Sequence, residues 1–254
     1  MLAVVDTHAH LSDLGDVEGA LRRAREKGVC AVVAVSANMR TCVETMRIAE
    51  AYRGFVYPAL GVHPTEIEAD YRDVLVYTEA NVDRCAAVGE AGLDFWRLRG
   101  QLSKAEDERR LQINVYTRQL EIAQRHSKPV IIHSRGAWEA SYHLAESLDI
   151  KKALFHWFTG SLQTLRSILD RGYLVSATPA VEYSKALRAI IRETPLASLV
   201  LETDCPVTYR GVASEPSDVL RSLGAVAELK DVLEEEVAES TTLNARKFFG
   251  LPAT

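Results

Sequence analysis

The sequence predicts one (β/α)8 barrel. Short apolar runs rich in β-branched residues alternate with longer amphipathic stretches, which is typical of parallel strands joined by right-handed helical crossovers. We count eight such runs, and eight strands favour a closed barrel over an open, doubly wound sheet. The length of 254 residues is near the usual size of such a barrel. A miscount by one strand would leave the open sheet as the alternative, although the sequence has no GxGxxG or Walker A motif.

The expected elements follow one another in a regular order. The strands cover residues 2–6, 29–35, 56–61, 86–90, 130–133, 153–156, 173–176 and 199–202. The helices between them cover residues 17–27, 41–52, 106–126, 138–148, 162–171 and 184–192. Residues 217–249 hold two extra C-terminal helices, and we expect Asp231 to be an N-cap there, with Glu234 three residues later.

Composition and charge limit the classes of function. With 47% hydrophobic and 26% charged residues, the chain is typical of an ordinary folded protein. A net charge of -5 disfavours a broadly basic surface for nucleic acid, so any such contact must be local. The four cysteines form no CxxC pair, and we expect reduced thiols in a cytoplasmic protein. We also expect neither a signal peptide nor a membrane span.

The strongest local signal is Asp6-Thr7-His8-Ala9-His10, at the end of the first expected strand. Side chains alternate between the faces of a strand, so Asp6, His8 and His10 point the same way. The C-terminal ends of barrel strands carry the active site. Two imidazoles there can hold one metal ion, whereas an isolated pair can equally lie on an exposed loop.

Further candidate ligands close other strands. Glu90 closes the fourth strand, where a carboxylate can bridge two metal ions. His133 closes the fifth strand and His156 the sixth, each after an apolar run. One such histidine is usually a core or rim residue, but two on consecutive strands favour a shared metal site.

The eighth strand adds an acidic residue. Asp204 shares a face with Glu202 and lies nearer the mouth of the barrel, so we expect Asp204 to be both a ligand and the proton acceptor. Glu202 is expected only to hold a neighbouring loop. The predicted ligands are therefore His8, His10, Glu90, His133, His156 and Asp204, with Asp204 and Glu90 as catalytic residues.

These residues lie in motifs that resemble the TatD family of metal-dependent deoxyribonucleases, within the amidohydrolase superfamily. The motifs are Val5-Asp6-Thr7-His8-Ala9-His10-Leu11, Gly61-Val62-His63-Pro64, Gly89-Glu90-Ala91-Gly92-Leu93-Asp94, His133-Ser134-Arg135, His156-Trp157-Phe158-Thr159-Gly160-Ser161 and Glu202-Thr203-Asp204-Cys205-Pro206. The resemblance runs from Val5 to Leu251 and implies one metal-dependent hydrolase domain, a TIM-type barrel, over residues 1–254.

The resemblance also implies one to three divalent metal ions. One ion would be held by His8, His10, Glu90 and Asp204, and a second by Glu90, His133 and His156, with Glu90 bridging. His63 would contact a substrate phosphate or an additional ion. The sequence departs from the family at Trp157, where a small residue or cysteine is usual, and at Ala213 and Ser214, which replace an Arg-Asn pair.

A metal-activated water fits hydrolysis of a phosphodiester bond. The expected reaction is 3′–5′ exonuclease cleavage of DNA, either single-stranded or at 3′ ends. Histidine ligands favour Zn, Mn or Co, although carboxylates can admit Mg. An ester or amide hydrolase, such as a D-aminoacyl-tRNA deacylase, is the alternative. A non-catalytic metal-binding barrel is disfavoured because the whole ligand set is present.

Substrate contacts are expected around the mouth of the barrel. Four arginines follow the strand ends and can hold a phosphate backbone: Arg97, Arg99, Arg135 and Arg210. Of these, Arg135 and Arg210 are the predicted substrate-binding residues, together with His63. Trp96 and Trp157 either stack on bases or pack the rim of the barrel.

Overall fold

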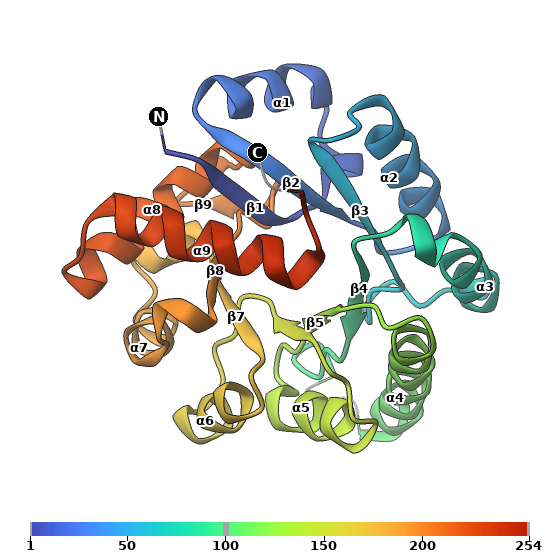
Figure 1. Ribbon diagram of the computed structural model, residues 1–254. Helices are drawn as coiled ribbons and strands as arrows, with labels where there is room; N and C mark the ends of the chain where they lie inside the picture. The colour runs from blue at the N-terminus through green and yellow to red at the C-terminus, as the bar shows by residue number, and fades with distance from the viewer. Residues whose placement is uncertain (1, 99–101, 253–254) are drawn as a thin grey trace.

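The computed structural model describes residues 2–98 and 102–252 and shows a barrel of parallel strands (Figure 1). The strands pair in sequence order: β1 (Val4–Ala9), β2 (Val29–Val35), β3 (Val56–Leu60), β4 (Ala87–Gly92), β5 (Val130–His133), β6 (Ala153–Phe155), β7 (Leu174–Ala177) and β8 (Leu199–Leu201). The prediction of a (β/α)8 barrel is confirmed. The first strand ends at Ala9 rather than at residue 6, so His8 lies within it.

Helices surround the strands on the outside of the barrel (Figure 1). They are α1 (Val17–Glu26), α2 (Met39–Ala51), α3 (Tyr71–Asn81), α4 (Leu102–Arg125), α5 (Trp138–Ser147), α6 (Leu162–Asp170), α7 (Lys185–Glu193), α8 (Val219–Lys230) and α9 (Glu234–Phe249). In the part of the chain that the structure describes, no helix is both long and apolar enough to cross a bilayer.

Two elements were absent from the sequence prediction. Helix α3 buries Val74 and Thr78, too few positions to give a clear amphipathic pattern. A small hairpin of β9 (Thr208–Tyr209) and β10 (Val212–Ala213) lies between β8 and α8. Strands of two residues are too short for an alternating pattern to predict.

The expected role of Asp231 is wrong. Asp231 ends α8 as its C-cap, with a left-handed backbone (φ 54°) that aspartate tolerates better than most residues. The N-cap of α9 is Leu233, which makes no side-chain capping bond. The first turn of α9 instead carries Glu234, Glu235 and Glu236, whose negative charges interact favourably with the positive end of the helix dipole.

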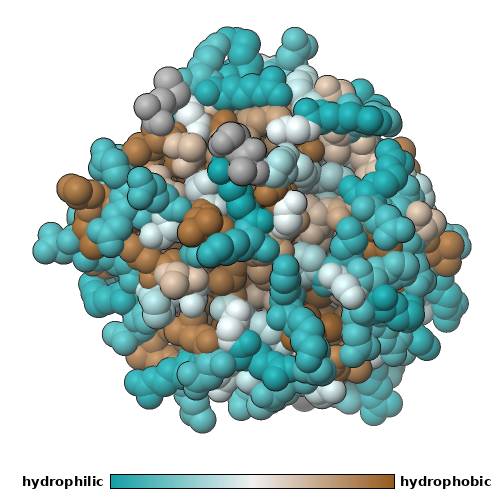
Figure 2. Space-filling model, in the orientation of Figure 1, coloured by the Kyte–Doolittle hydropathy of each residue, from teal (hydrophilic) through white to brown (hydrophobic). Residues whose placement is uncertain are grey.

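Helix α9 closes the end of the barrel at which the strands begin. Its residues Ala245, Phe248 and Phe249 are buried in one cluster with inward-facing residues near the strand starts, such as Ile131 and Leu154. Figure 1 shows α9 lying across the barrel, and hydrophilic residues cover most of this face in Figure 2. The opposite end, at which the strands finish, is left open for the functional site.

Buried polar groups join β1 to β8 where the barrel closes. Asp6 Oδ1 accepts the backbone N–H of Thr203 at 2.9 Å, and Asp6 Oδ2 accepts the Thr203 hydroxyl at 2.6 Å. The Thr7 hydroxyl donates to the Leu201 carbonyl at 2.8 Å. All four residues are buried, so these bonds replace hydration that the groups lose on folding.

The same seam continues above the strands. The backbone N–H of Asp204 donates to the carbonyl of His8 at 2.9 Å, and the N–H of His10 donates to the carbonyl of Cys205 at 2.8 Å. The contacts that close the barrel therefore also fix His8 and His10 beside Asp204.

We predict that Asp6→Ala lowers the free energy of unfolding by about 2–3 kcal/mol, because it leaves buried donors of Thr203 and His8 without an acceptor. Asp6→Asn should cost clearly less, since its amide oxygen can still accept the Thr203 N–H. Urea denaturation followed by circular dichroism measures both. Equal stability of Asp6→Ala and the wild-type protein would show that these bonds do not hold the seam.

Candidate metal centre

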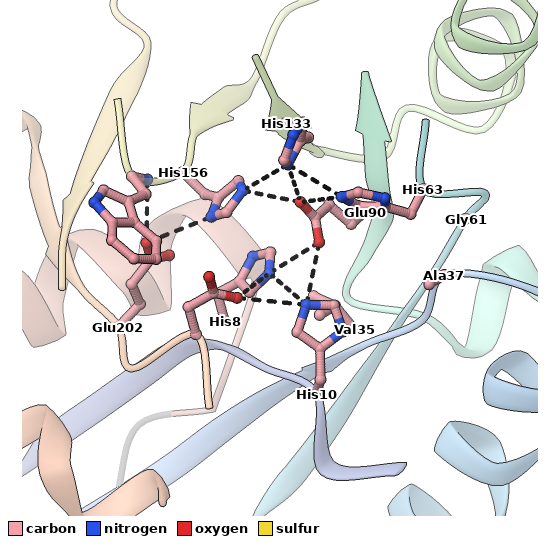
Figure 3. A network of polar contacts seen from close by, with 12 residues as sticks. His8, His10, Val35, Ala37, Gly61, His63, Glu90, His133, His156 and Glu202 are labelled. Carbon is pink, nitrogen blue, oxygen red and sulfur yellow. Dashed lines mark hydrogen bonds and ion pairs between the residues drawn. The ribbon is translucent and has the colours of Figure 1, made fainter. Parts of the chain in front are cut away.

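The side chains predicted as ligands converge at the C-terminal end of the barrel. His8 lies in β1 with His10 directly after it, Glu90 lies in β4, His133 ends β5, His156 follows β6 and Asp204 follows β8. Figure 3 shows the four histidines turned towards the carboxylate of Glu90. The structure thus brings together residues that are almost two hundred positions apart in the sequence.

The first group of ligand atoms has the dimensions of a tetrahedral site. His8 Nε2 and His10 Nε2 lie 3.4 Å apart. Each of these nitrogens is 3.2 Å from Glu90 Oε2 and 3.4 Å from Asp204 Oδ1. Ligand atoms ~2.0–2.1 Å from a tetrahedral ion lie ~3.3–3.4 Å from one another. These four atoms therefore fit one divalent ion.

The other oxygen of Glu90 faces a second group. Glu90 Oε1 is 2.7 Å from His133 Nδ1 and 2.9 Å from His156 Nε2, and these two nitrogens are 3.3 Å apart. Glu90 is only 1% exposed, so its charge must be compensated inside the protein. Its carboxylate lies between the two groups of nitrogen atoms, in the position of a bridging ligand.

Carboxylates behind two of the histidines orient their rings. His133 Nε2 donates to Asp94 Oδ2 at 3.1 Å, so a neutral His133 ring would offer the lone pair of Nδ1 to a metal ion. A carboxylate in this position fixes the tautomer of a metal-ligating histidine. His156 Nδ1 lies 3.5 Å from Glu202 Oε1 without a hydrogen bond, and this oxygen accepts the backbone N–H of Trp157 at 3.1 Å. Glu202 also holds the loop after β6, the role expected of it.

His63 lies beside the second group but presents a different atom. Its Nε2 is 3.2 Å from His133 Nδ1 and 3.5 Å from Glu90 Oε1. Its Nδ1 accepts the backbone N–H of Thr65 at 3.1 Å. Because a backbone N–H can only donate, the proton of the neutral His63 ring is on Nε2. His63 therefore points an N–H into the centre, whereas the Asp94 pairing of His133 leaves its Nδ1 as the atom that could bind a metal ion.

The electrostatics favour ionised carboxylates around this centre. Burial raises the pKa of Glu90, but the neighbouring histidines outweigh it and hold the pKa well below its usual range. Burial also opposes ionisation of Asp204, whose pKa is lowered by the hydrogen bond with His10. Burial lowers the pKa of His63 to about 3, so this ring is neutral at physiological pH.

Two glutamines of α4 position the loops that carry His63 and Asp94. Gln119 Oε1 accepts the N–H of Val62 at 2.7 Å, and its Nε2 donates to the carbonyl of Val62 at 3.1 Å. Gln112 pairs with the backbone of Asp94 in the same way, at 2.9 and 3.3 Å. The two glutamines are two helical turns apart, so they lie on the same face of α4.

The centre forms the floor of a cleft of about 890 Å³. Arg135 and Arg97 line this cleft. The Arg135 side chain is 47% exposed, and its Nε and Nη2 atoms each lie 2.9 Å from Asp94 Oδ2. Burial raises the pKa of Asp94, but its hydrogen bond with His133 and the charge of Arg135 lower it to about 2. Asp94 therefore connects the metal centre to a cation at the cleft wall.

Arg210 lies at the turn of the β9–β10 hairpin, where its guanidinium is 5.2 Å from the centre of the Tyr183 ring. Among the described residues, the lining of the cleft includes Thr208 of this hairpin but not Arg210. A contact between Arg210 and a substrate stays a prediction. Arg99 lies outside the residues that the structure describes.

Sequence reasoning gave no role to Asp94 or Thr65. A signal for Asp94 exists, since it lies two strand periods after Glu90 and such spacing puts both residues on one face. Thr65 contacts His63 through its backbone amide and its hydroxyl, and neither contact has a sequence pattern.

Comparison with known proteins agrees with these observations. A family model described as TatD related DNase matches residues 5–250. The chain is 35% identical to deoxyribonuclease TATDN3 of Homo sapiens over 267 residues, which cover 98% of this chain and 95% of that protein. It is 31% identical to the uncharacterized metal-dependent hydrolase YabD of Bacillus subtilis, covering 96% of this chain and 98% of that protein.

A solved structure is also similar. The crystal structure of YjjV, a TatD homolog from Escherichia coli K12, matches with a TM-score of 0.87 and 28% identity, covering 98% of each chain. The match extends over the barrel and over the strand ends that carry the histidines. The chain belongs to the TatD-related DNase family and is a metal-dependent hydrolase.

Proposed function

We propose that this chain is a deoxyribonuclease that uses divalent metal ions to remove nucleotides from the 3′ ends of DNA. The observation that carries the proposal is the carboxylate of Glu90, whose two oxygens face two separate groups of ligand atoms on the floor of a cleft. Two-metal sites of this kind suit displacement at a phosphodiester. The human relative is named deoxyribonuclease TATDN3, which supports DNA as the polymer.

The proposal extends to the architecture and the location of the protein. We take residues 1–254 as one catalytic domain, since the strands that carry the ligands extend from β1 to β8. We also keep a cytoplasmic location as a prediction, which the four free cysteines support.

Each of the two groups of ligand atoms would hold one metal ion. One ion would be held by His8, His10, Glu90 and Asp204, and another by Glu90, His133 and His156. Ions bound there would supply Lewis-acid activation of a water molecule and of the phosphate. The mixture of imidazole and carboxylate donors suits Zn, Mn or Co, and it can admit Mg.

The residues of the chain then have distinct tasks. Asp204 is ionised and lines the cleft, so it accepts the proton of the attacking water. His63 donates its Nε2–H to a phosphate oxygen, where negative charge develops. Arg135, at the cleft wall, holds the phosphate backbone through charge-assisted hydrogen bonds.

Metal-reconstituted protein should shorten a 5′-labelled single-stranded DNA oligonucleotide stepwise from its 3′ end. Asp204→Asn should lower the rate by about 10²–10⁴-fold, because an amide does not accept the proton. EDTA should abolish cleavage. Denaturing gels of the labelled products, with Mg, Mn, Co and Zn in turn, measure both effects.

Activity that persists in the Asp204→Asn protein would indicate a contaminating nuclease. A wild-type protein that cleaves no DNA with any of the four metals would contradict the proposed function. A D-aminoacyl-tRNA assayed in parallel then tests an ester hydrolase at the same centre.

Substitutions of the neighbouring residues His63 and His133 should have different effects on the metal content of the protein. His133→Ala should lose about one equivalent of bound metal, since it removes a lone pair that faces Glu90. His63→Ala should keep the wild-type metal content and lose about 10²-fold in rate, because it removes a donor to the phosphate. Elemental analysis after gel filtration measures the metal content. Equal metal loss in both variants would make His63 a ligand.

A further inference from the structure

All three tryptophans of the chain follow consecutive strands at the same end of the barrel. Trp96 comes after β4, Trp138 begins α5 after β5, and Trp157 comes after β6. Trp138 and Trp157 line the cleft above the metal centre, and both are partly buried against the core. Trp157 directly follows His156, so its backbone is joined to that of a predicted metal ligand.

The backbone of Trp157 has a conformation that a bulky residue seldom adopts. Its φ of 42° lies in the left-handed region, which costs a non-glycine residue conformational energy. The loop holds this conformation through the Trp157 N–H, which donates to Ser176 Oγ at 2.9 Å and to Glu202 Oε1 at 3.1 Å. Residues kept in such a conformation occur preferentially at functional sites.

Packing restricts the indole of Trp157 further. Its ring centre is 5.8 Å from that of Tyr209, with 41° between the two planes. Tyr209 is itself fixed, because its hydroxyl donates to the carbonyl of Thr203 at 2.6 Å and the residue is buried. The indole is therefore supported from behind by a rigid aromatic ring, and it also lines the cleft.

Trp138 packs against the loop that carries Trp157. A Cβ atom at Gly160 would lie 2.8 Å from Trp138 Cγ, closer than real side chains approach one another. Glycine at this position therefore lets the indole of Trp138 lie directly on the backbone of the loop after β6. The indole of Trp157 therefore begins the short segment 157–160, and the indole of Trp138 packs on its other end at Gly160. Both indoles line the cleft.

We propose that Trp157 and Trp138 form a nucleobase-binding subsite beside the metal centre, which takes one unpaired base next to the scissile phosphate. The inference rests on the proposed function and deepens it. Indoles stack on any of the four bases, so the subsite is tolerant of sequence. Arg135, on the same cleft wall, is placed to hold the adjoining phosphate.

The subsite also selects the state of the DNA. A base inside a duplex is already stacked on its neighbours and must leave the helix before it can contact an indole. A single strand or a frayed 3′ end offers the base without that cost. Selection of unpaired ends therefore follows from two aromatic side chains and needs no basic surface, in agreement with the net charge of -5.

Kinetics with modified oligonucleotides test the subsite. One substrate is a natural single strand, and two others carry an abasic residue on either side of the terminal phosphodiester. For the wild-type protein, one abasic substrate should lose about tenfold in kcat/KM. Trp157→Ala should lose about tenfold on the natural strand and should no longer distinguish the three substrates. Trp157→Phe keeps a flat ring and should lose only about two- to threefold.

Two controls separate base binding from damage to the centre. A strand built entirely of abasic residues offers no aromatic ring, and the Trp157 and Trp96 variants should cleave it within about twofold of the wild-type rate. Trp96→Phe is the matched tryptophan control, since Trp96 follows β4 and is 50% exposed but, among the described residues, is not part of the cleft lining. It should cleave the natural strand as the wild-type protein does.

Tryptophan fluorescence gives a readout that does not require catalysis. Deoxyadenosine 5′-monophosphate should quench the metal-loaded wild-type protein and Trp96→Phe, whereas deoxyribose 5-phosphate should not. Most of this quenching should disappear in Trp157→Phe. Because this variant needs little change in packing, it decides the question even if Trp157→Ala fails to fold.

The outcomes distinguish the subsite from the proposed function. DNA cleavage that is indifferent to abasic residues and to Trp157→Ala would overturn the subsite and leave the nuclease intact. Base-dependent quenching without any DNA cleavage would support the subsite and overturn the nuclease. Equal quenching by the two phosphates would also overturn the subsite.

Discussion

The site depends on one buried charge. Placing the carboxylate of Glu90 at 1% exposure inside a barrel is costly unless the protein surrounds it with groups that compensate the charge. Histidines from β1, β5 and β6 and from the loop after β3 do this, at distances of 2.7–3.5 Å. These five histidines come from four different strand ends, because one strand presents a side chain on the inner face only at alternate positions and only His8 and His10 share a strand. A closed barrel is therefore a precondition of the centre.

The contacts that close the barrel between β1 and β8 also position the residues of the centre. Asp6 and Thr203 are 197 positions apart, and their hydrogen bonds bring the last strand against the first. Predicted ligands follow on both segments: His8 is two residues after Asp6, Asp204 is directly after Thr203, and the Asp204 N–H donates to the His8 carbonyl. Loss of order at this seam would separate Asp204 from His8 and His10. Stability and metal binding are coupled here through the backbone.

The sequence predicts the strands, and it predicts which side chains meet at their ends, because both depend on local patterns. The apolar runs that end in Glu90, His133 and His156 identify the strand and its inner face at once. Contacts across the site have no such pattern. His63 in the loop after β3 and His133 at the end of β5 are the same residue type, and only the partner of the second ring nitrogen, Thr65 N–H or Asp94 carboxylate, separates the proposed donor from the proposed ligand. The hairpin that places Arg210 over Tyr183 and the cap at Asp231 also depend on backbone geometry that the sequence pattern does not contain.

The predicted ligands and the residues proposed to contact the substrate lie on different parts of the barrel, and this affects substrate specificity. The predicted ligands lie on or next to the strands, whose positions are set by the packed core. Trp157 and Arg135 lie on the loops that follow, and Trp138 lies at the start of α5. Loop residues can be substituted without disturbing the hydrogen bonds between the strands, and this allows one barrel fold to act on many substrates. Asp94 is the exception, because a single carboxylate holds both His133 and Arg135. The proposed phosphate-binding cation, Arg135, is thus tied to the predicted metal ligand His133, whereas Asp94 holds neither indole. Base selection can therefore diverge within this fold while the position of the phosphate over the centre stays fixed.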